Sequence, residues 1–214
     1  MRTQMRQKDT KTRLLDAAEG LFAQNGYANT SLRAVTGRAE ANLASVKYHF
    51  GSKEALLTAV LSRRLQPLNC LRRQRLEAAM ELAFNESRPP RAREILRAFI
   101  EPTLAFRNSG RGARSFIVII SRALADPEPT VRTSFLDQIL PIMSYFSECL
   151  ATALPHLPEE QRFWRFHFMM GSLAHIMHGL DKKELFPKDM VPADPNTLIT
   201  MLLTFLTAGM EAAP

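Results

Sequence analysis

The stretch from Thr30 to Leu56, TSLRAVTGRAEANLASVKYHFGSKEAL, contains two short helical patterns separated by a tight turn. An apolar stripe at three- and four-residue steps marks the first pattern and is formed by Leu32, Val35 and Ala39. Thr30 or Ser31 is the expected N-cap of this helix, and the turn follows at Glu40-Ala41. Helices this short are stable only when they pack on other parts of the chain, so the stretch predicts a compact helical cluster.

Helical patterns on both sides of this stretch predict an all-α fold. Hydrophobic residues make up 46% of the 214 residues, and 13 Phe and 10 Met against 9 Gly favour packed helices over hairpins. The first helix is expected from about Thr10 to Gln24, with a stop at Asn25-Gly26. Further helices are expected over residues 42–49, 52–85, 92–107, 113–125, 128–154, 158–180 and 195–212. Three of them contain a proline that should kink the helix, namely Pro67, Pro102 and Pro141.

The short helix from about Asn42 to His49 has an apolar face and a polar face. Three apolar residues cluster on a helical wheel and should face the core, namely Leu43, Val46 and Phe50. The other face carries small or hydrogen-bonding side chains, namely Ala44, Ser45 and Tyr48. Such a surface suits a helix that docks in the major groove of DNA, with an ordinary three-helix subdomain as the alternative. Ser52 should cap the next helix, whose first amides and Lys53 would bind a phosphate.

The basic charge is concentrated in the first part of the chain, although the net charge is +7. Lys and Arg outnumber Asp and Glu by nine to five in residues 1–55 and by eight to three in residues 56–93. In residues 94–214 the balance is eleven to thirteen. A phosphate-rich partner should therefore bind the N-terminal part. Residues 1–8 are expected to form a loose basic arm, either a disordered tail or a DNA contact.

The segment from Arg13 to Leu61 resembles the DNA-binding domain of TetR-family transcriptional regulators. The likeness is carried by LLDAAEGLFAQNGY, TSLR and YHFGSKEAL. NLASVKYHFGSK further resembles the fatty-acid-responsive, PsrA-like branch of that family, as does FWRFHFMMGSLAHIMHG at residues 163–179, more loosely. The resemblance implies a homodimeric repressor that binds a pseudo-palindromic double-stranded DNA operator and is released by a small hydrophobic, fatty-acyl ligand. A regulator of the same fold that responds to an aromatic or drug-like ligand is the alternative.

The resemblance also implies a division of the chain and a set of DNA contacts. Residues 1–55 would form the helix-turn-helix DNA-binding domain, and residues 56–214 the ligand-binding and dimerisation domain. Phosphate contacts are implied for Thr30, His49 and Lys53. Base or groove contacts are implied for Arg33, Asn42, Ala44, Ser45, Lys47 and Tyr48.

Two positions depart from the family pattern. Glu40 occupies the turn position where the family usually has Gly, so a non-glycine residue is expected to adopt an unfavourable backbone conformation. Lys47 stands where a Tyr is common, which indicates an individual operator preference.

A dense basic set follows on the long helix, consisting of Arg63, Arg64, Arg72, Arg73 and Arg75. The sequence is compatible with a solvated helix face, with long-range attraction to DNA, and with a site for an anionic ligand head group such as a carboxylate or a coenzyme A phosphate.

Inward-facing Phe, Met, Ile and Thr residues recur in the helices that follow. The candidates are Phe99, Thr103, Phe106, Phe116, Ile120, Ile139, Met143, Phe146, Phe166 and Met170. Such a stripe is by itself typical of an ordinary core. The resemblance implies instead that these residues line the inducer cavity that regulators of this family keep in the C-terminal domain, and Phe and Met suit a flexible acyl chain.

The last two helices are apolar over much of their circumference, most clearly in LITMLLTFLTAGM. Pairing them with a second copy would bury a four-helix interface, which the resemblance also implies. Small residues that would allow close approach are Gly171, Ser172 and Ala174.

Other classes of protein find little support in the sequence. His167, His175 and His178 share one side of a helix, but core or interface histidines are favoured over a metal site because no carboxylate or thiolate lies nearby. The sequence has no phosphate-binding glycine loop, no GxSxG and no HExxH, so neither an enzyme nor a bound cofactor is expected. Cys70 and Cys149 are expected to be packing residues in a reducing compartment. Without a signal peptide or a spanning segment, the protein is expected to be cytoplasmic and to make no membrane contact.

Overall fold

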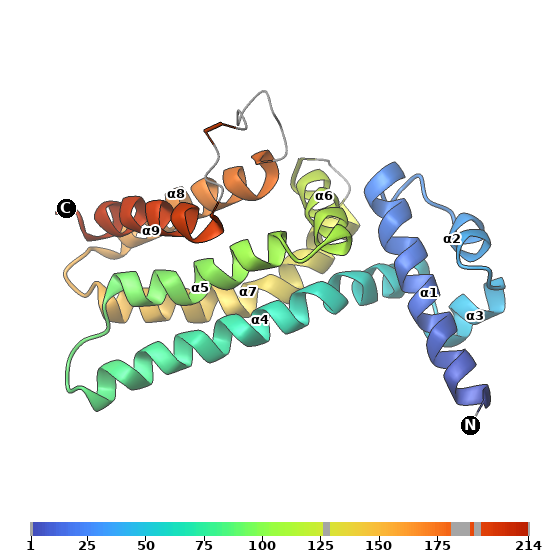
Figure 1. Cartoon of the computed structure of the whole chain (residues 1–214), viewed down its shortest axis with the longest axis horizontal. Coiled ribbons are helices and arrows are strands. Elements are labelled where there is room, and N and C mark those ends of the chain that lie inside the picture. The colour runs from blue at the N-terminus through green and yellow to red at the C-terminus, as the bar shows by residue number, and fades with distance from the viewer. Residues whose placement is uncertain (1, 126–128, 181–188, 191–193, 214) are drawn as a thin grey trace. The chain divides into compact units, whose positions relative to one another are not determined.

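The computed structural model describes residues 2–125, 129–180, 189–190 and 194–213, with side chains for all of these except residues 2–9 and 123–125. Over these ranges the chain forms nine α-helices and no β-strand, which confirms the predicted all-α class (Figure 1). The helices are α1 (Arg2–Asn25), α2 (Leu32–Arg38), α3 (Leu43–His49), α4 (Lys53–Asn85), α5 (Ala92–Arg107), α6 (Arg111–Ala125), α7 (Pro129–Ala153), α8 (Glu159–Gly179) and α9 (Pro195–Glu211). Among the described residues, no helix is both long enough and apolar enough to cross a membrane.

The observed helix bounds agree with the predicted bounds to within about two residues, except at the N-terminus. α1 begins at Arg2, so the loose arm predicted for residues 1–8 is wrong for residues 2–8. Residues 2–13 include no Gly or Pro, and the Arg, Gln, Met and Lys residues there are good helix formers. α1 ends where expected, because Gly26 has a φ of 81° and its N–H donates to the Phe22 carbonyl at 3.0 Å.

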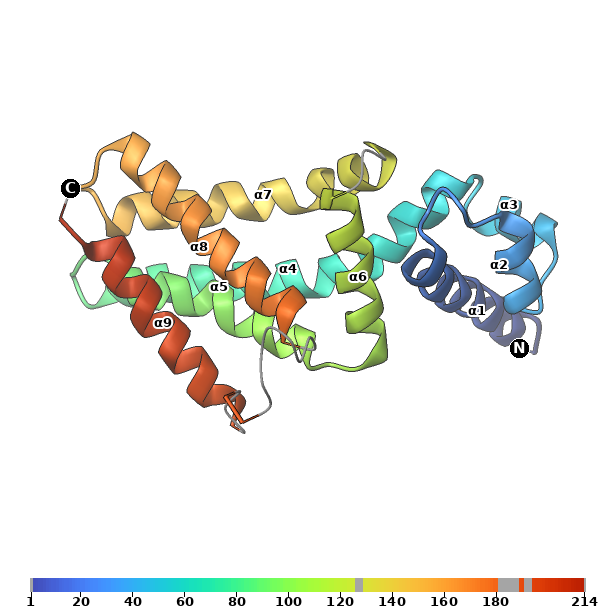
Figure 2. The same cartoon turned by 90° about the horizontal axis from the view of Figure 1, so that it is seen from above.

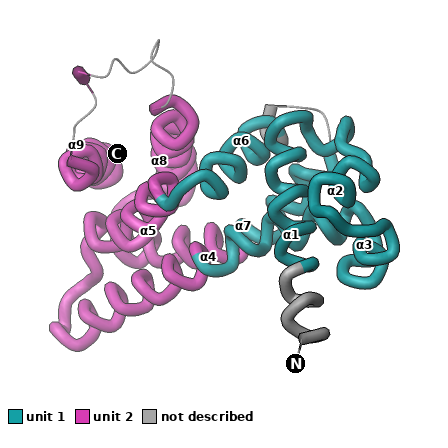
Figure 3. Tube along the Cα trace, turned by 45° about the vertical axis from the view of Figure 1, so that its right-hand side comes forward, with its two compact units in different colours: residues 1–67, 109–139 teal, residues 68–108, 140–214 magenta. Residues whose placement is uncertain are grey.

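The chain divides into two compact units, which Figure 3 shows in different colours. Unit 1 consists of residues 1–67 and 109–139, and unit 2 of residues 68–108 and 140–214. The division passes through α4 at Pro67 and through α7 one residue before Pro141. It differs from the predicted domains 1–55 and 56–214 because α6, which packs on α1, and the first parts of α4 and α7 belong to unit 1. The functional boundary at residue 55 stays a prediction.

Unit 1 has a core in which α1 packs against α2, α3 and α6. Its fully buried apolar side chains include Leu14, Phe22, Val35, Val46, Leu56, Leu57 and Leu61. Burying each side chain of this size contributes about 1.5 to 3 kcal/mol. Val46 is buried as predicted and Phe50 is half-buried, but the prediction for Leu43 is wrong because that side chain is 50% exposed. Leu43 is the first residue of a seven-residue helix, and so short a helix buries only its centre.

Unit 2 is organised around α5, which packs against α8 and α9, while α8 also packs against α9 (Figure 2). The rings of Phe99 and Phe146 stack in its core, with centroids 4.3 Å apart and planes 9° from parallel. Cys149 is buried, as expected of a packing residue, but Cys70 is exposed and that part of the prediction is wrong. The buried stripe of α4 runs through Leu65, Leu68, Arg72 and Leu76, and residue 70 falls between these positions.

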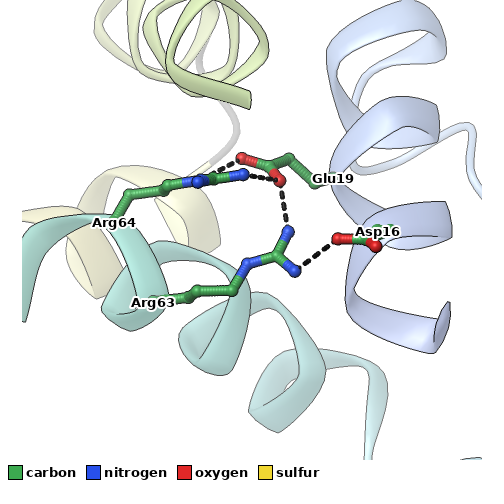
Figure 4. A network of polar contacts seen from close by, with 4 residues as sticks. All are labelled: Asp16, Glu19, Arg63 and Arg64. Atoms are coloured by element: carbon green, nitrogen blue, oxygen red, sulfur yellow. Dashed lines mark hydrogen bonds and ion pairs between the residues drawn. The ribbon is translucent and has the colours of Figure 1, made fainter. Parts of the chain in front are cut away.

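A charged network joins α1 to α4 within unit 1 (Figure 4). Glu19 is only 4% exposed, and its two oxygens accept hydrogen bonds at 2.8 Å from Nε and a terminal nitrogen of Arg64. Arg63 donates to the same carboxylate and also to Asp16. The hydrogen bonds with Glu19 raise the pKa of the Arg64 guanidinium above its usual range. Two guanidiniums thus compensate one buried carboxylate, and α1 is fixed to the first part of α4.

Removing the Glu19 charge should destabilise the protein more than removing the exposed charge beside it. We expect Glu19→Gln to lower the free energy of unfolding by about 2 kcal/mol, because two partly buried guanidiniums lose their common carboxylate. Asp16 is the matched control, since its side chain is 63% exposed, and Asp16→Asn should cost about 0.5 kcal/mol or less. Urea unfolding followed by circular dichroism measures both, and equal effects would contradict the assigned role of Glu19.

Candidate nucleic-acid interface

The two short helices of unit 1 both begin at a side-chain cap. Ser31 has extended backbone angles, and its hydroxyl accepts a hydrogen bond from the Ala34 N–H at 3.1 Å, so Ser31 is the N-cap of α2. Asn42 caps α3, because its side-chain oxygen accepts from the N–H of Ser45 at 2.8 Å and from the Ser45 hydroxyl at 2.9 Å. These caps satisfy N–H groups that a helix end leaves without partners, and they determine where each helix starts.

The turn between α2 and α3 contains a left-handed, non-glycine residue. Glu40 has a φ of 49°, its N–H donates to the Gly37 carbonyl, and the N–H of Ala41 donates to the Thr36 carbonyl at 3.0 Å. This pair of bonds is the Schellman ending of a helix, in which the left-handed position usually belongs to Gly. The expectation of an unfavourable backbone conformation at Glu40 is therefore confirmed. At the end of α3 the corresponding position is Gly51, with a φ of 83°.

The outward surface of α3 carries most of the residues implied to contact DNA. Tyr48 is 72% exposed, and its ring lies edge-on to the half-buried His49 ring, with centroids 5.0 Å apart. Ala44 and Lys47 are exposed and Ser45 is half-buried. A phenol, a lysine and small side chains on one short helix match the needs of close groove approach and polar contact.

Leu43 also lies on this surface, although its helical spacing predicts a core position. An exposed leucine at the start of a groove-binding helix offers an apolar contact for a thymine methyl group. The N-cap at Asn42 is the sequence feature that would have predicted an exposed position for Leu43. A cap at residue 42 makes Leu43 the first helical residue, beyond the part of α3 that the core covers.

Of three further candidates, two have environments that restrict what they can do, and the third is exposed. Thr30 is 1% exposed and its hydroxyl donates to the Gly26 carbonyl at 2.7 Å, so it is not available for the implied phosphate contact. Asn42 uses its side-chain oxygen in the cap, which leaves its NH₂ group as a donor toward base acceptors. Arg33 is exposed on α2.

The start of α4 holds Lys53 in a defined position. Its ammonium lies 4.2 Å from the centroid of the Tyr27 ring and 3.4 Å from the Ala28 carbonyl oxygen. Ser52 caps α4 as predicted, accepting from the Ala55 N–H at 3.0 Å. The lysine and the first amides of a long helix lie together, which is a favourable arrangement for a phosphate. Tyr27 was not recognised from the sequence as the support of this lysine.

The basic set of α4 is solvated only in part, because Arg73 and Arg75 are exposed whereas Arg72 is buried, and all of its members contact partners. Arg63 and Arg64 bind Asp16 and Glu19, whereas Arg75 donates to Glu101 at 2.7 Å. Arg73 lies over the ring of Tyr145, 4.7 Å from its centroid, with the Glu77 carboxylate at 3.7 Å. Arg72 is buried. Glu77 lies four residues beyond Arg73 on α4 itself, whereas Asp16, Glu19, Glu101 and Tyr145 belong to other helices and were not revealed by helical spacing.

The predicted ligand-lining residues fall in both units. Unit 2 contains Phe99, Thr103, Phe106, Met143, Phe146, Phe166 and Met170, and unit 1 contains Phe116, Ile120 and Ile139. Phe99, Thr103 and Phe146 are buried, and the Phe166 ring lies 5.8 Å from that of Phe146. Among the residues with described side chains, no group of three or more His, Cys, Asp or Glu is placed to hold a metal ion.

Sequence comparison places both parts of the chain among bacterial regulators. Residues 14–60 match the family of bacterial regulatory proteins, tetR family, and residues 97–209 match the tetracyclin repressor-like, C-terminal domain. The HTH-type transcriptional regulator UidR of Escherichia coli (strain K12) is 36% identical over 52 residues, which are 24% of this chain and 26% of UidR. The probable HTH-type transcriptional regulator ArpR of Pseudomonas putida is 28% identical over 111 residues, 44% of this chain and 52% of ArpR. The matched regions thus span between about a quarter and about half of these relatives.

Solved structures share the fold over nearly the whole chain. The fatty acid degradation regulator FadR from Bacillus halodurans has a TM-score of 0.69 at 13% identity, covering 95% of this chain and 97% of FadR. Salmonella enterica GusR has a TM-score of 0.62 at 17% identity, covering 95% and 96%. NalD, the secondary repressor of the MexAB-OprM multidrug efflux pump in Pseudomonas aeruginosa, has a TM-score of 0.62 at 19% identity, covering 95% and 97%. At these identities the likeness establishes the fold alone.

The left-handed conformation of Glu40 generates a stability prediction. Glu40→Gly should raise the free energy of unfolding by about 1 kcal/mol relative to Glu40→Ala, because Gly adopts a positive φ without a Cβ penalty. Both variants lose the exposed contact with Arg13 at 3.9 Å, so their difference isolates the backbone effect. Thermal and urea unfolding measure it, and a Gly variant no more stable than the Ala variant would overturn the claim of strain.

Proposed function

This chain belongs to the TetR family of bacterial regulatory proteins as a DNA-binding transcriptional regulator and not an enzyme, and we propose that it represses its genes as a homodimer on a pseudo-palindromic operator. The observation that supports this best is the capped helix α3, whose exposed side includes Ala44, Lys47 and Tyr48. Two copies of α3 would enter successive major grooves about one helical turn, roughly 34 Å, apart. Lys53 and the first amides of α4 would bind the flanking phosphate.

Dimerisation through α8 and α9 is supported by their exposed apolar side chains. Five large ones are at least half exposed on these two helices, namely Phe163, Trp164, Phe168, Met201 and Phe205. Phe168 and Phe205 also line a groove of about 200 Å³ between the helices. Large contiguous apolar patches on a protein surface mark interaction sites, and a second copy of the same helix pair would bury this one.

The effector that we propose is a small hydrophobic molecule of the fatty-acyl class. The Phe and Met candidates of unit 2, of which Phe99 and Phe146 are buried, suit a flexible chain, and the likeness of NLASVKYHFGSK to the PsrA-like branch points the same way. FadR, a fatty acid degradation regulator, shares the fold, but so does NalD, a repressor of a multidrug pump, so an aromatic or drug-like effector is the second candidate. An effector that prefers the conformation unable to fit the operator would release the DNA by linkage.

Tyr48 and Lys53 should affect DNA binding in different ways. On operator DNA selected by the purified protein from a random-sequence library, Tyr48→Ala should lose at least about 1 kcal/mol of binding free energy, and less on unrelated DNA. Lys53→Ala should weaken all sequences similarly and reduce the slope of log K against log salt by about one unit. Fluorescence anisotropy over a range of salt concentrations measures both. Unchanged operator binding by Tyr48→Ala, or a sequence-selective loss with Lys53→Ala, would refute the respective assignment.

The effector class can be tested on the protein–DNA complex. Palmitate or palmitoyl-CoA titrated into the complex should release the operator, and release should be competitive with DNA because the two ligands favour different conformations. If neither compound releases DNA while aromatic or drug-like compounds do, the PsrA-like assignment is rejected and the second candidate is supported. The repressor proposal is judged separately, by operator binding without effector.

A further inference from the structure

Arg72 is the one buried cation among the residues whose side chains the structure describes. It lies on the buried stripe of α4 and is 5% exposed. No carboxylate of the described residues forms an ion pair with it, whereas the buried carboxylate of Glu19 is met by two guanidiniums. Buried charges in proteins are normally paired, because the loss of hydration costs several kcal/mol per ion. Arg72 therefore needs an explanation beyond packing.

The hydrogen-bond partners of Arg72 are neutral oxygens. Nε and one terminal nitrogen donate to the Thr103 hydroxyl at 3.2 and 2.9 Å, and the other terminal nitrogen donates to the Asn69 side-chain oxygen at 2.9 Å. Thr103 in turn donates to the Phe99 carbonyl at 2.7 Å, which fixes its orientation. Each terminal nitrogen carries two hydrogens and has one acceptor among the described residues, so each retains a second N–H. The guanidinium is oriented, but neither its charge nor its hydrogen-bonding capacity is fully satisfied.

The surroundings of the guanidinium are apolar and aromatic. Its central carbon lies 4.3 Å from the centroid of the Phe99 ring, which is stacked on Phe146. Phe99, Thr103 and Phe146 all belong to the set that the family resemblance implies to line an effector cavity. Burial lowers the pKa of Arg72 to about 9, so at neutral pH the side chain is still a cation. A cation is thus held at the edge of an aromatic cluster within unit 2.

We propose that Arg72 is the head-group site of the effector, and that the effector is a hydrophobic carboxylic acid in its free, ionised form. This inference rests on the proposed hydrophobic effector and specifies its chemistry. The carboxylate accepts hydrogen bonds from the two remaining terminal N–H groups, a geometry that suits the planar guanidinium. Asn69 and Thr103 hold the guanidinium in place, and the Phe99 cluster contacts the apolar part next to the head group. An acyl-CoA thioester lacks the carboxylate, so it should bind more weakly here than the free acid.

Acids and matched neutral alcohols provide the direct test. Isothermal titration of the full-length protein with dodecanoate, dodecanol, 1-naphthoate and 1-naphthalenemethanol compares the head groups on a flexible chain and on an aromatic body. We expect the acid of at least one pair to bind about 10-fold or more tightly than its alcohol, and dodecanoyl-CoA to bind more weakly than dodecanoate. Equal binding of acid and alcohol in every pair that binds would overturn the head-group site and leave the proposed hydrophobic effector standing.

Variants of Arg72 show whether the preference comes from this side chain. Arg72→Met should abolish the preference for the acid, retain binding of the alcohol, and leave the melting temperature equal or higher, because an unpaired buried charge is replaced by an apolar side chain. Arg72→Lys should retain part of the preference. Arg73→Met is the matched control, since Arg73 is the adjacent arginine with a 47% exposed side chain, and it should bind both ligands as the wild type does.

The outcomes separate this inference from the proposed function. A preference for the acid that survives in Arg72→Met overturns the assignment, as does the absence of any binding to the wild type. The absence of binding would also reject the proposal of a hydrophobic effector. The repressor proposal is still tested separately, by operator binding without effector. If Arg72→Met does not fold, the comparison of acid with alcohol on the wild type and on Arg72→Lys decides: an equal preference in both contradicts a guanidinium site.

Discussion

The buried carboxylate of Glu19 is the interaction on which the DNA-reading part of the molecule depends. α2 and α3 pack against α1, and α1 is held to α4 by the two guanidiniums that compensate this charge. A carboxylate with 4% exposure cannot exchange these partners for water without a large penalty. The contact of Glu19 with Arg63 and Arg64 therefore fixes the position of α1, and of the α3 helix packed on it, relative to α4. Lys53, at the start of the same α4, is placed by the same constraint.

The arginines of α4 that lie near the core have two different electrostatic environments. Arg63 and Arg64, in unit 1, are neutralised by carboxylates of α1, and this contributes to stability. Arg72, in unit 2, donates to the neutral oxygens of Asn69 and Thr103 and has no carboxylate partner among the described residues. In the proposed mechanism the effector supplies the missing anion. The same helix would then connect the DNA-binding end with the ligand site, and DNA and effector would oppose each other if they prefer different conformations of the protein.

Much of the fold could be read from the sequence, because helical spacing and breakers such as Asn25-Gly26 act locally. The residues placed wrongly were those whose environment depends on other elements. Leu43 lies beyond the part of α3 that the core covers, and Thr30 turns its hydroxyl inward to Gly26. The partners of Arg63 and Arg64 come from α1 and are invisible to local patterns. Arg72 is different, since Leu65, Leu68 and Leu76 already define a buried stripe that includes residue 72.

The size of α3 explains why the proposed regulator needs both of its units. In the proposed complex, a helix of seven residues offers few side chains to base edges, chiefly the exposed Lys47 and Tyr48 with the NH₂ group of Asn42. Each good base contact contributes only about 1 to 3 kcal/mol of discrimination, so one half-site offers limited specificity. Linking two half-sites in one dimer raises affinity without any new contact, because the second binding event becomes intramolecular. In the proposed dimer, the apolar surface of α8 and α9 in unit 2 would supply that link, so specificity on DNA would depend on both units.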